Sequence, residues 1–394
     1  MNALEWRAVL GLGLVYALRM VGMFMVLPVF ALYAHELPGG ATPWQIGLAM
    51  GAYGLAQALL QVPLGLLSDR IGRKPVIFIG MAIFAFGSVV AGMAQSIEMI
   101  TIGRLLQGAG AVSSAVAALL ADVTRDQVRT TAMAILGAGM GLAFILAIVA
   151  GPIVSGYIGV HGIFFLTAVL ALLTLPVVAF GVPTPDLQAA PAGGFRDVLG
   201  HPVLLRLNAG IFLLHALMMA LFTAAPLAIR DTLGLASEQH WRVYLPILLL
   251  SILPVFPLIR SAERGGHAGL VFRCAIALLG AAMLIAGLGH TQSALLLASL
   301  LLFFIGFNYL EGALPSMISR RAPAARRGAA LGVYATSQFL GASAGGALGG
   351  FAQSHFGLTG AFIACALLPM IWLLIPAGAS FETHPAPAAL KTNS

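Results

Sequence analysis

Twelve apolar stretches, each about as long as a membrane-spanning helix, recur along the chain. They are residues 8–33, 44–66, 75–94, 98–121, 131–157, 161–181, 203–229, 241–260, 269–288, 293–318, 328–352 and 358–376. A helix needs about 20 predominantly apolar residues to cross a bilayer, whereas a membrane β-barrel would show alternating segments of about 10. Only 8% of the 394 residues are charged, against roughly a quarter in a soluble domain. The sequence therefore predicts an all-α membrane protein with twelve transmembrane helices.

The basic residues are distributed unevenly between the two sides of these spans. With a cytoplasmic N-terminus, 16 of the 20 Lys and Arg residues lie on the inner side, two lie outside and two lie within spans. Cytoplasmic loops carry an excess of Lys and Arg, so both termini are predicted to be cytoplasmic. The net charge of +7 is then a topology signal, which also favours contact with anionic lipid, and no nucleic-acid partner is expected.

The chain is predicted to consist of two similar halves. We expect a six-helix bundle over 1–181, a cytoplasmic connector over 182–202, a second six-helix bundle over 203–377 and a short cytoplasmic tail over 378–394. Three features recur in order: LSDRIGRK (67–74) with RSAERGGH (260–267), RTTAMA (129–134) with RGAALG (327–332), and Gly151 with Gly349. With Asp69 aligned to Glu263 the first pair is offset by 194 residues, and the other two pairs are offset by 198. The offsets differ by only four, which indicates an internal duplication and two pseudo-symmetric bundles.

Three motifs carry a resemblance to a known family. GLLSDRIGRK lies between spans two and three, RLLQGAGA (104–111) lies in span four, and GAGMGLAFILAIVAGP (137–152) ends span five. With twelve spans in a 6+6 repeat, the chain resembles the major facilitator superfamily, and within it the proton-driven drug exporters. The exporter it most resembles has an extra C-terminal cytoplasmic domain, which we expect to be absent, since the chain ends about 18 residues after its last predicted span.

The resemblance assigns a gating role to the first motif and an antiporter-type role to the third. The gating residues are Gly65, Asp69, Arg70, Gly72, Arg73 and Lys74, with Asp122 as the acidic candidate to pair with Arg73. The antiporter-type residues are Gly137, Gly141, Gly151 and Pro152. The N-terminus of a helix stabilises a nearby carboxylate, and the resemblance implies that Asp69 contacts the start of span eleven when the inner gate is closed. The alternative is that the loop serves only to anchor the topology.

Four ionisable residues lie deep within spans, where a charge costs at least about 2.5–3.5 kcal/mol. They are Arg19, Arg104, His215 and Glu311, and they fall on spans one, four, seven and ten. Such groups should face a partner or a cavity. The resemblance implies that these four spans line a central cavity.

The four residues have different candidate roles. Glu311 is the one carboxylate well inside a span, and because burial favours a neutral carboxyl group it is the first candidate to carry a proton. Arg19 does not lose its proton, so it either pairs with Glu311 or contacts an anionic substrate. Arg104 has a role in proton transfer or bonds to backbone carbonyls, and His215 either titrates or is packed and neutral.

Other polar and small residues complete the prediction. The amides that could face a cavity or join helices are Gln57, Gln61 and Asn308. GASAGGALGG, residues 341–350, predicts a small-residue face for close packing of helices.

The sequence lacks the motifs of an ATPase, a metalloenzyme or a hydrolase. We therefore expect no catalytic residues, no metal and no cofactor, with the proton gradient as the energy source. The predicted function is export of small amphipathic compounds in exchange for protons, by a monomer in the cell inner membrane. Two alternatives stay open: an importer or facilitator of a specific metabolite, an anionic one included, and a transporter-like sensor or lipid-handling protein without solute flux.

Overall fold

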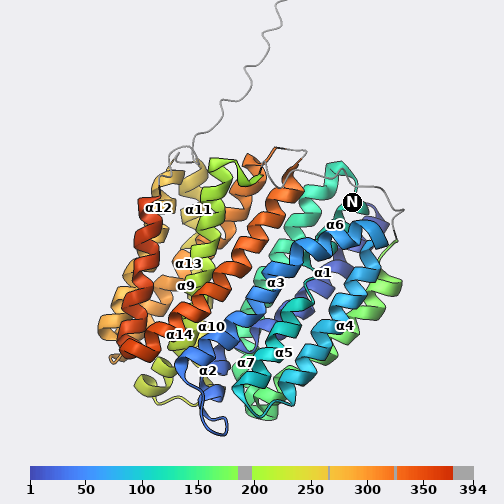
Figure 1. Ribbon diagram of the computed structural model, residues 1–394. Helices are drawn as coiled ribbons and strands as arrows, with labels where there is room; N and C mark the ends of the chain where they lie inside the picture. Colours follow the sequence, from blue (N-terminus) through green and yellow to red (C-terminus); the bar gives the residue numbers. More distant parts are fainter. Residues whose placement is uncertain (185–197, 265–266, 324–325, 376–394) are drawn as a thin grey trace, which may run out of the picture.

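The computed structural model describes residues 1–184, 198–264, 267–323 and 326–375 (Figure 1). Most of the predicted connector, and the predicted tail, lie outside the described residues. Within the described ranges the chain forms helices and no strands. Ten helical stretches are long and apolar enough to cross a membrane, and two of these, of 55 and 47 residues, are twice the necessary length.

The first half runs from α1 to η1. Its elements are α1 (Ala3–Phe24), α2 (Leu27–His35), α3 (Pro43–Ile71), α4 (Arg73–Gly92), α5 (Ile97–Ala109), α6 (Ser113–Asp122), α7 (Asp126–Pro176) and the π-helical turn η1 (Val177–Gly181). Side-chain N-caps determine where several of these helices begin. Thr42, for example, starts α3 with a capping box, in which its side chain accepts from the backbone of Gln45 and the Gln45 side chain accepts from the backbone of Thr42.

The second half repeats this order. Its elements are α9 (Pro202–Leu233), the 3₁₀ turn η2 (Ser237–Gln239), α10 (Trp241–Ile252), α11 (Val255–Arg264), α12 (Ala268–Gly289), α13 (Ser293–Arg321) and α14 (Arg327–Leu374). The pairs α1–α2, α5–α6 and α10–α11 are each one crossing interrupted by a short break.

Two glycines divide the longest helices. Gly159 within α7 has φ 68° and Gly357 within α14 has φ 64°, a left-handed conformation that glycine adopts without steric cost. Each glycine turns the chain back, so α7 and α14 supply two crossings apiece and the described chain makes twelve. The two positions are 198 residues apart, which is the offset of the predicted internal repeat.

The repeat extends to a close contact that an equivalent glycine makes in each half. A Cβ added at Gly151 of α7 would lie 2.2 Å from the Met25 carbonyl oxygen, between α1 and α2. The equivalent Gly349 of α14 would meet Thr223 Oγ1 of α9 at 2.6 Å. Thr223 lies 198 residues after Met25. The structure therefore confirms two pseudo-symmetric six-helix bundles.

The start of the chain and the end of α14 lie at one face of the molecule, which we call the terminal face; the turn before α3 lies at the opposite face, the far face (Figure 1). At the far face, α3 and α14 pack backbone to backbone. A Cβ at Gly47 would lie 2.1 Å from the Gly346 carbonyl oxygen, and one at Gly350 would lie 2.4 Å from that of Pro43. The predicted small-residue face of 341–350 thus meets α3, and the two helices diverge from there toward the terminal face (Figure 1).

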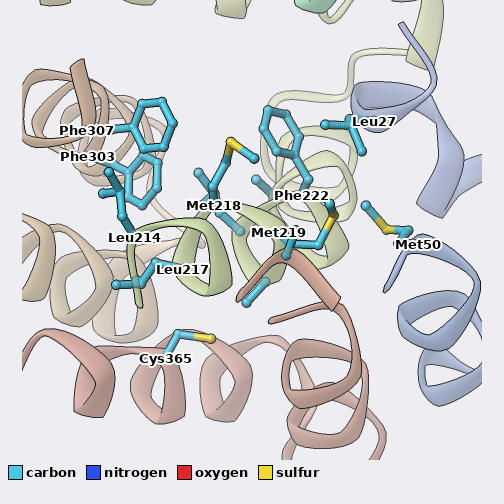
Figure 2. Close-up of a cluster of buried hydrophobic side chains, with 14 of the residues drawn as sticks. Leu27, Met50, Leu214, Leu217, Met218, Met219, Phe222, Phe303, Phe307 and Cys365 are labelled. Atoms are coloured by element: carbon cyan, nitrogen blue, oxygen red, sulfur yellow. The ribbon is translucent and has the colours of Figure 1, made fainter. Parts of the chain in front are cut away.

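The two halves share an apolar core near the far face. Figure 2 shows Leu27 of α2 and Met50 of α3 gathered beside Met219 and Phe222 of α9, and all four belong to one buried cluster that draws on both halves. A second cluster, around Leu12 and Phe84, is built from the first half, with Phe339 as its one member from the second among the described residues. Shared packing at the far face and separate packing toward the terminal face describe a protein closed at one face.

Candidate functional site

A polar cluster lies inside the first half, around Arg19. Tyr53 and Gln57 are spaced by four residues on α3, so their side chains lie one above the other on a single helix face. Arg19 Nη2 of α1 donates to Tyr53 Oη and to Gln57 Oε1, each at 2.6 Å, and Nη1 donates to Ser113 Oγ at 3.3 Å. Gln57 Nε2 in turn donates to Gln61 Oε1 at 3.0 Å. We call these five residues the Arg19 cluster.

Arg104 of α5 also lies beside Tyr53. Its guanidinium carbon is 5.0 Å from the centre of the Tyr53 ring, and Nη1 donates to Gln107 Oε1 at 3.0 Å. Gln107 Nε2 donates to Ser88 Oγ of α4. Arg104 therefore bonds to a side-chain amide rather than to the backbone carbonyls considered from the sequence.

The two guanidinium groups are buried without an acidic partner in the described part of the chain. Arg19 is 1% exposed and Arg104 2% exposed. Burying a charge is costly unless hydrogen bonds and nearby charges compensate; here the compensation comes from neutral oxygens and from the faces of Tyr53 and Phe84. Arg19 Nε has no hydrogen-bond partner. The first half thus holds two buried positive charges within its membrane-spanning helices.

The second half holds the complementary group, Glu311 of α13. Its Oε2 lies 3.9 Å from Nδ1 of His215 on α9, and its Oε1 accepts from Nε2 of Gln338 on α14 at 3.5 Å. The same Gln338 nitrogen lies 2.8 Å from His215 Nε2. Three helices therefore bring together what we call the Glu311 cluster: Glu311, His215 and Gln338. Arg19, which the sequence offered as a partner for Glu311, has its bonds within its own half.

Aromatic rings lie between the two clusters. Phe144 of α7 is edge-on to Phe24 at a centroid distance of 5.0 Å and lies 6.0 Å from Phe307 of α13 in the other half. Phe307 is one helical turn from Glu311 and 6.0 Å from the His215 ring. Tyr53 makes a second contact between halves, 6.3 Å from Phe339. Asn308, a predicted cavity amide, instead donates to Ser251 Oγ of α10.

The motif between α3 and α4 forms an ion-pair network at the terminal face. Arg73 Nε donates to Asp122 Oδ2 at 3.0 Å, which is the pairing expected from the sequence, and Arg73 Nη1 also bonds Asp69 and Ser68. Lys74 Nζ donates to the Val182 carbonyl at 2.7 Å and so holds the start of α4 to the chain after η1. Gly72, with φ 98°, makes the turn between the helices, and Arg70 is exposed.

The remaining motif residues are divided by depth. A Cβ at Gly65 would touch Ser114 Oγ at 3.2 Å, whereas Cβ atoms at Gly137 and Gly141 would meet nothing within 4 Å. Gly151, deeper in α7, packs against the Met25 carbonyl as described above, and Pro152 beside it is buried. The glycine motif is therefore packed at its far-face end and unpacked at its terminal-face end.

Sequence reasoning missed three members of these clusters. Tyr53 could have been found from its position four residues before Gln57, as one polar stripe on α3. Gln338 has an analogous signal, because it follows Tyr334 by four residues on α14 and Tyr334 faces Glu311. Ser113 gives no such signal, since a serine within an apolar helix is common and its role depends on the break between α5 and α6.

The comparisons with known proteins agree on one family. The model of the Major Facilitator Superfamily matches residues 12–346, with a second match over 262–393. The inner membrane transport protein YajR of Escherichia coli strain K12 is 45% identical over 94% of this chain and 83% of its own length. The class B tetracycline resistance protein of Escherichia coli is 31% identical over 41% of this chain and 40% of its own length.

Solved structures show the same fold. A bacterial homologue of the human lysosomal transporter Spinster, in an inward-facing and unoccupied conformation, has a TM-score of 0.79 at 14% identity, covering 98% of this chain and 100% of that one. With the ten long apolar helical stretches, these findings describe a multi-pass inner-membrane protein that is not an enzyme. The chain belongs to the Major Facilitator Superfamily of membrane transporters.

Proposed function

We propose that the protein exports small amphipathic compounds in exchange for protons, by alternating access. The carrying observation is the Glu311 cluster. Within the described residues, Glu311 is the one carboxyl group placed near the middle of a crossing, and its Oε2 has no hydrogen-bond partner. A carboxyl group in such surroundings exchanges between neutral and charged forms more readily than one fixed in an ion pair.

The uneven distribution of the basic residues supports a cytoplasmic terminal face, and with that assignment the structure corresponds to an inward-facing state. In this state Glu311 releases its proton to the cytoplasmic side and a substrate binds between the halves. After the far face opens, the substrate leaves and a proton from outside neutralises Glu311. The inward proton gradient then drives export, and no other cofactor is required.

The relatives support this direction of transport. Two tetracycline resistance proteins are 31% and 28% identical to this chain over 41% and 46% of its length, and removal of a compound from the cell is a direct route to resistance. The aromatic rings of Phe144, Phe307 and Phe339, which are buried between the halves in this state, give that interface the apolar character that an apolar or aromatic compound requires once the halves separate.

A second candidate is import or facilitated diffusion of an anionic metabolite. The observation that favours it is the pair Arg19 and Arg104, which are buried without a carboxylate partner in the described chain. Their burial argues against direct substrate contact in this state, so we place this candidate second.

A transport assay with a panel of fluorescent amphipathic compounds in inverted membrane vesicles separates these functions. Proton-coupled export predicts accumulation inside the vesicles that a protonophore abolishes. Equilibration that persists after the protonophore would indicate facilitated diffusion. A sensor or lipid-handling protein would produce no flux with any compound, with or without the gradient.

A further inference from the structure

Gln338 links the two titratable members of the Glu311 cluster. Its Nε2 lies 2.8 Å from His215 Nε2 and 3.5 Å from Glu311 Oε1. A side-chain amide nitrogen carries two hydrogens and no acceptor. One hydrogen can point to the imidazole and the other to the carboxylate, whereas the reversed amide would place an oxygen against the carboxylate oxygen.

This arrangement selects one form of the histidine. If His215 Nε2 accepts from Gln338, the proton of the neutral ring must be on Nδ1, because a neutral imidazole has one donor and one acceptor nitrogen. His215 Nδ1 faces Glu311 Oε2 at 3.9 Å, and the Ile211 carbonyl, one turn earlier on α9, is the other acceptor facing the ring. The carboxylate beside Nδ1 is an acceptor, as a donor at that nitrogen requires, and Nδ1 has no other hydrogen-bond partner among the residues that the structure describes.

The surroundings add no competing charge. The pair consists of His215 on α9 and Glu311 on α13. Among the described residues, the further titratable group that faces it is the Tyr334 hydroxyl on α14, which has no hydrogen-bond partner. On α13, Phe307 covers the His215 ring. His215 is only 6% exposed, and a charged imidazole there would lack water.

We propose that Gln338 is a positioning residue: it holds neutral His215 with its proton on Nδ1, so that His215 donates to the Glu311 carboxylate and does not carry the transported proton. The proposal rests on the proposed function, in which Glu311 exchanges the proton. The ring and the carboxylate need to approach by about 1 Å to bond, which we assign to the ionised form of Glu311. Because Gln338 is on α14, the helix that packs against α3 at the far face, this contact connects the proton site to the moving interface.

The direct test is the ¹⁵N NMR spectrum of histidine-labelled protein in liposomes. The signals of His215, one of nine histidines, are identified by their loss in His215→Asn. We expect a protonated Nδ1 and an unprotonated Nε2, and a mixture of both tautomers in Gln338→Leu but not in the control Gln353→Leu on the same helix. A proton on Nε2 in the native protein, a charged ring at neutral pH, or no change in Gln338→Leu overturns the proposal.

A second test measures the consequence for Glu311. N,N′-dicyclohexylcarbodiimide modifies protonated carboxyl groups, so its labelling of Glu311 against pH, read by mass spectrometry, reports ionisation without a substrate. An asparagine amide reproduces the Nδ1 position of histidine and a glutamine amide the Nε2 position. We expect His215→Asn to keep the native profile, and His215→Gln and Gln338→Leu to shift its midpoint to higher pH by about one unit.

The opposite order, with His215→Gln native-like and His215→Asn shifted, would contradict the proposal, and so would three unchanged profiles. Neither experiment involves transport, so a failure here is distinguishable from a failure of proton-coupled export.

Discussion

A single methyl group at the far face should shift the protein toward its other access state. In Gly47→Ala, the new Cβ would lie 2.1 Å from the Gly346 carbonyl oxygen and 2.9 Å from Gly350 Cα. Both neighbours are backbone atoms, so no side-chain rotation relieves the contact. An ordinary carbon–oxygen contact of about 3.3 Å requires α3 and α14 to separate by roughly 1 Å.

The cost falls on the closed far face alone, since alternating access separates these helices in the other state. Overpacking of this kind costs about 1–3 kcal/mol, which changes a two-state ratio by about 5- to 150-fold. Gly137→Ala is the matched control, because it makes the same change within a helix but its Cβ meets nothing within 4 Å. Any general gain from alanine's helix propensity is common to both variants.

The assay is the distance between spin labels across the far face, measured by pulsed electron resonance in liposomes. Cysteines at exposed Met99, before the middle of α5, and at exposed Thr291, before α13, carry the labels in a chain whose Cys274 and Cys365 are replaced by alanine. We expect a longer-distance population to grow in Gly47→Ala but not in Gly137→Ala. Identical distance distributions in the two variants would refute the steric argument.

Three further perturbations follow from the contacts described. Asp69→Asn should remove a charge–dipole contact from the closed inner gate, which is worth up to about 2 kcal/mol and therefore up to about thirtyfold in the closed-to-open ratio. Distances between spin labels at the terminal face measure this ratio. Unchanged distances would mean that the motif serves only to anchor the topology. Glu5→Gln should lower the melting temperature in detergent, since the buried Glu5 carboxylate accepts two bonds from the Arg125 guanidinium, at 2.8 and 3.1 Å; an unaltered melting curve would show that this pair is not stabilising. Gly349→Ala, whose Cβ would lie 2.8 Å from Ala220 Cα, should lower the melting temperature in detergent by overpacking α14 against α9 within the second half, whereas Gly141→Ala should not; equal melting temperatures would contradict the close packing.

Much of the fold was predictable because it depends on patterns that can be read along the sequence. Apolar length gives the twelve crossings, and the glycine-rich stretch 341–350 predicts close packing. Its partner, α3, was not predictable, since any helix with small residues at the right spacing would serve. The pairing of Arg73 with Asp122 was predictable because few acidic residues lie at the terminal face, and because the order of the spans puts both residues at that face.

The site was predictable in its charged members but not in their partners. Arg19, Arg104, His215 and Glu311 stand out because a charge in a span is costly. Which residue satisfies each one depends on helix rotation, which a uniformly apolar span does not encode. Arg19 thus proved to bond Tyr53 and neutral oxygens in its own half.

The division of opposite charges between the two halves has a physical consequence for the transport cycle. Arg19 and Arg104 concentrate positive charge in the first half, and Glu311 supplies the one mid-span carboxyl group in the described second half. Ionised Glu311 is therefore attracted toward the first half and neutral Glu311 is not. Protonation of this one group is thus able to change the balance between the two access states.

The most direct test of the account is transport by Glu311→Gln, with Glu98→Gln at the exposed start of α5 as the control. In vesicles carrying an amphipathic compound that the wild-type protein accumulates, two activities are compared: accumulation driven by the pH gradient, and exchange of labelled for unlabelled compound without a gradient. Glutamine resembles the protonated carboxyl group, so Glu311→Gln should lose accumulation and keep an exchange that no longer varies with pH, while Glu98→Gln behaves as wild type. Accumulation against a gradient by Glu311→Gln would contradict the assignment of Glu311 as the proton carrier.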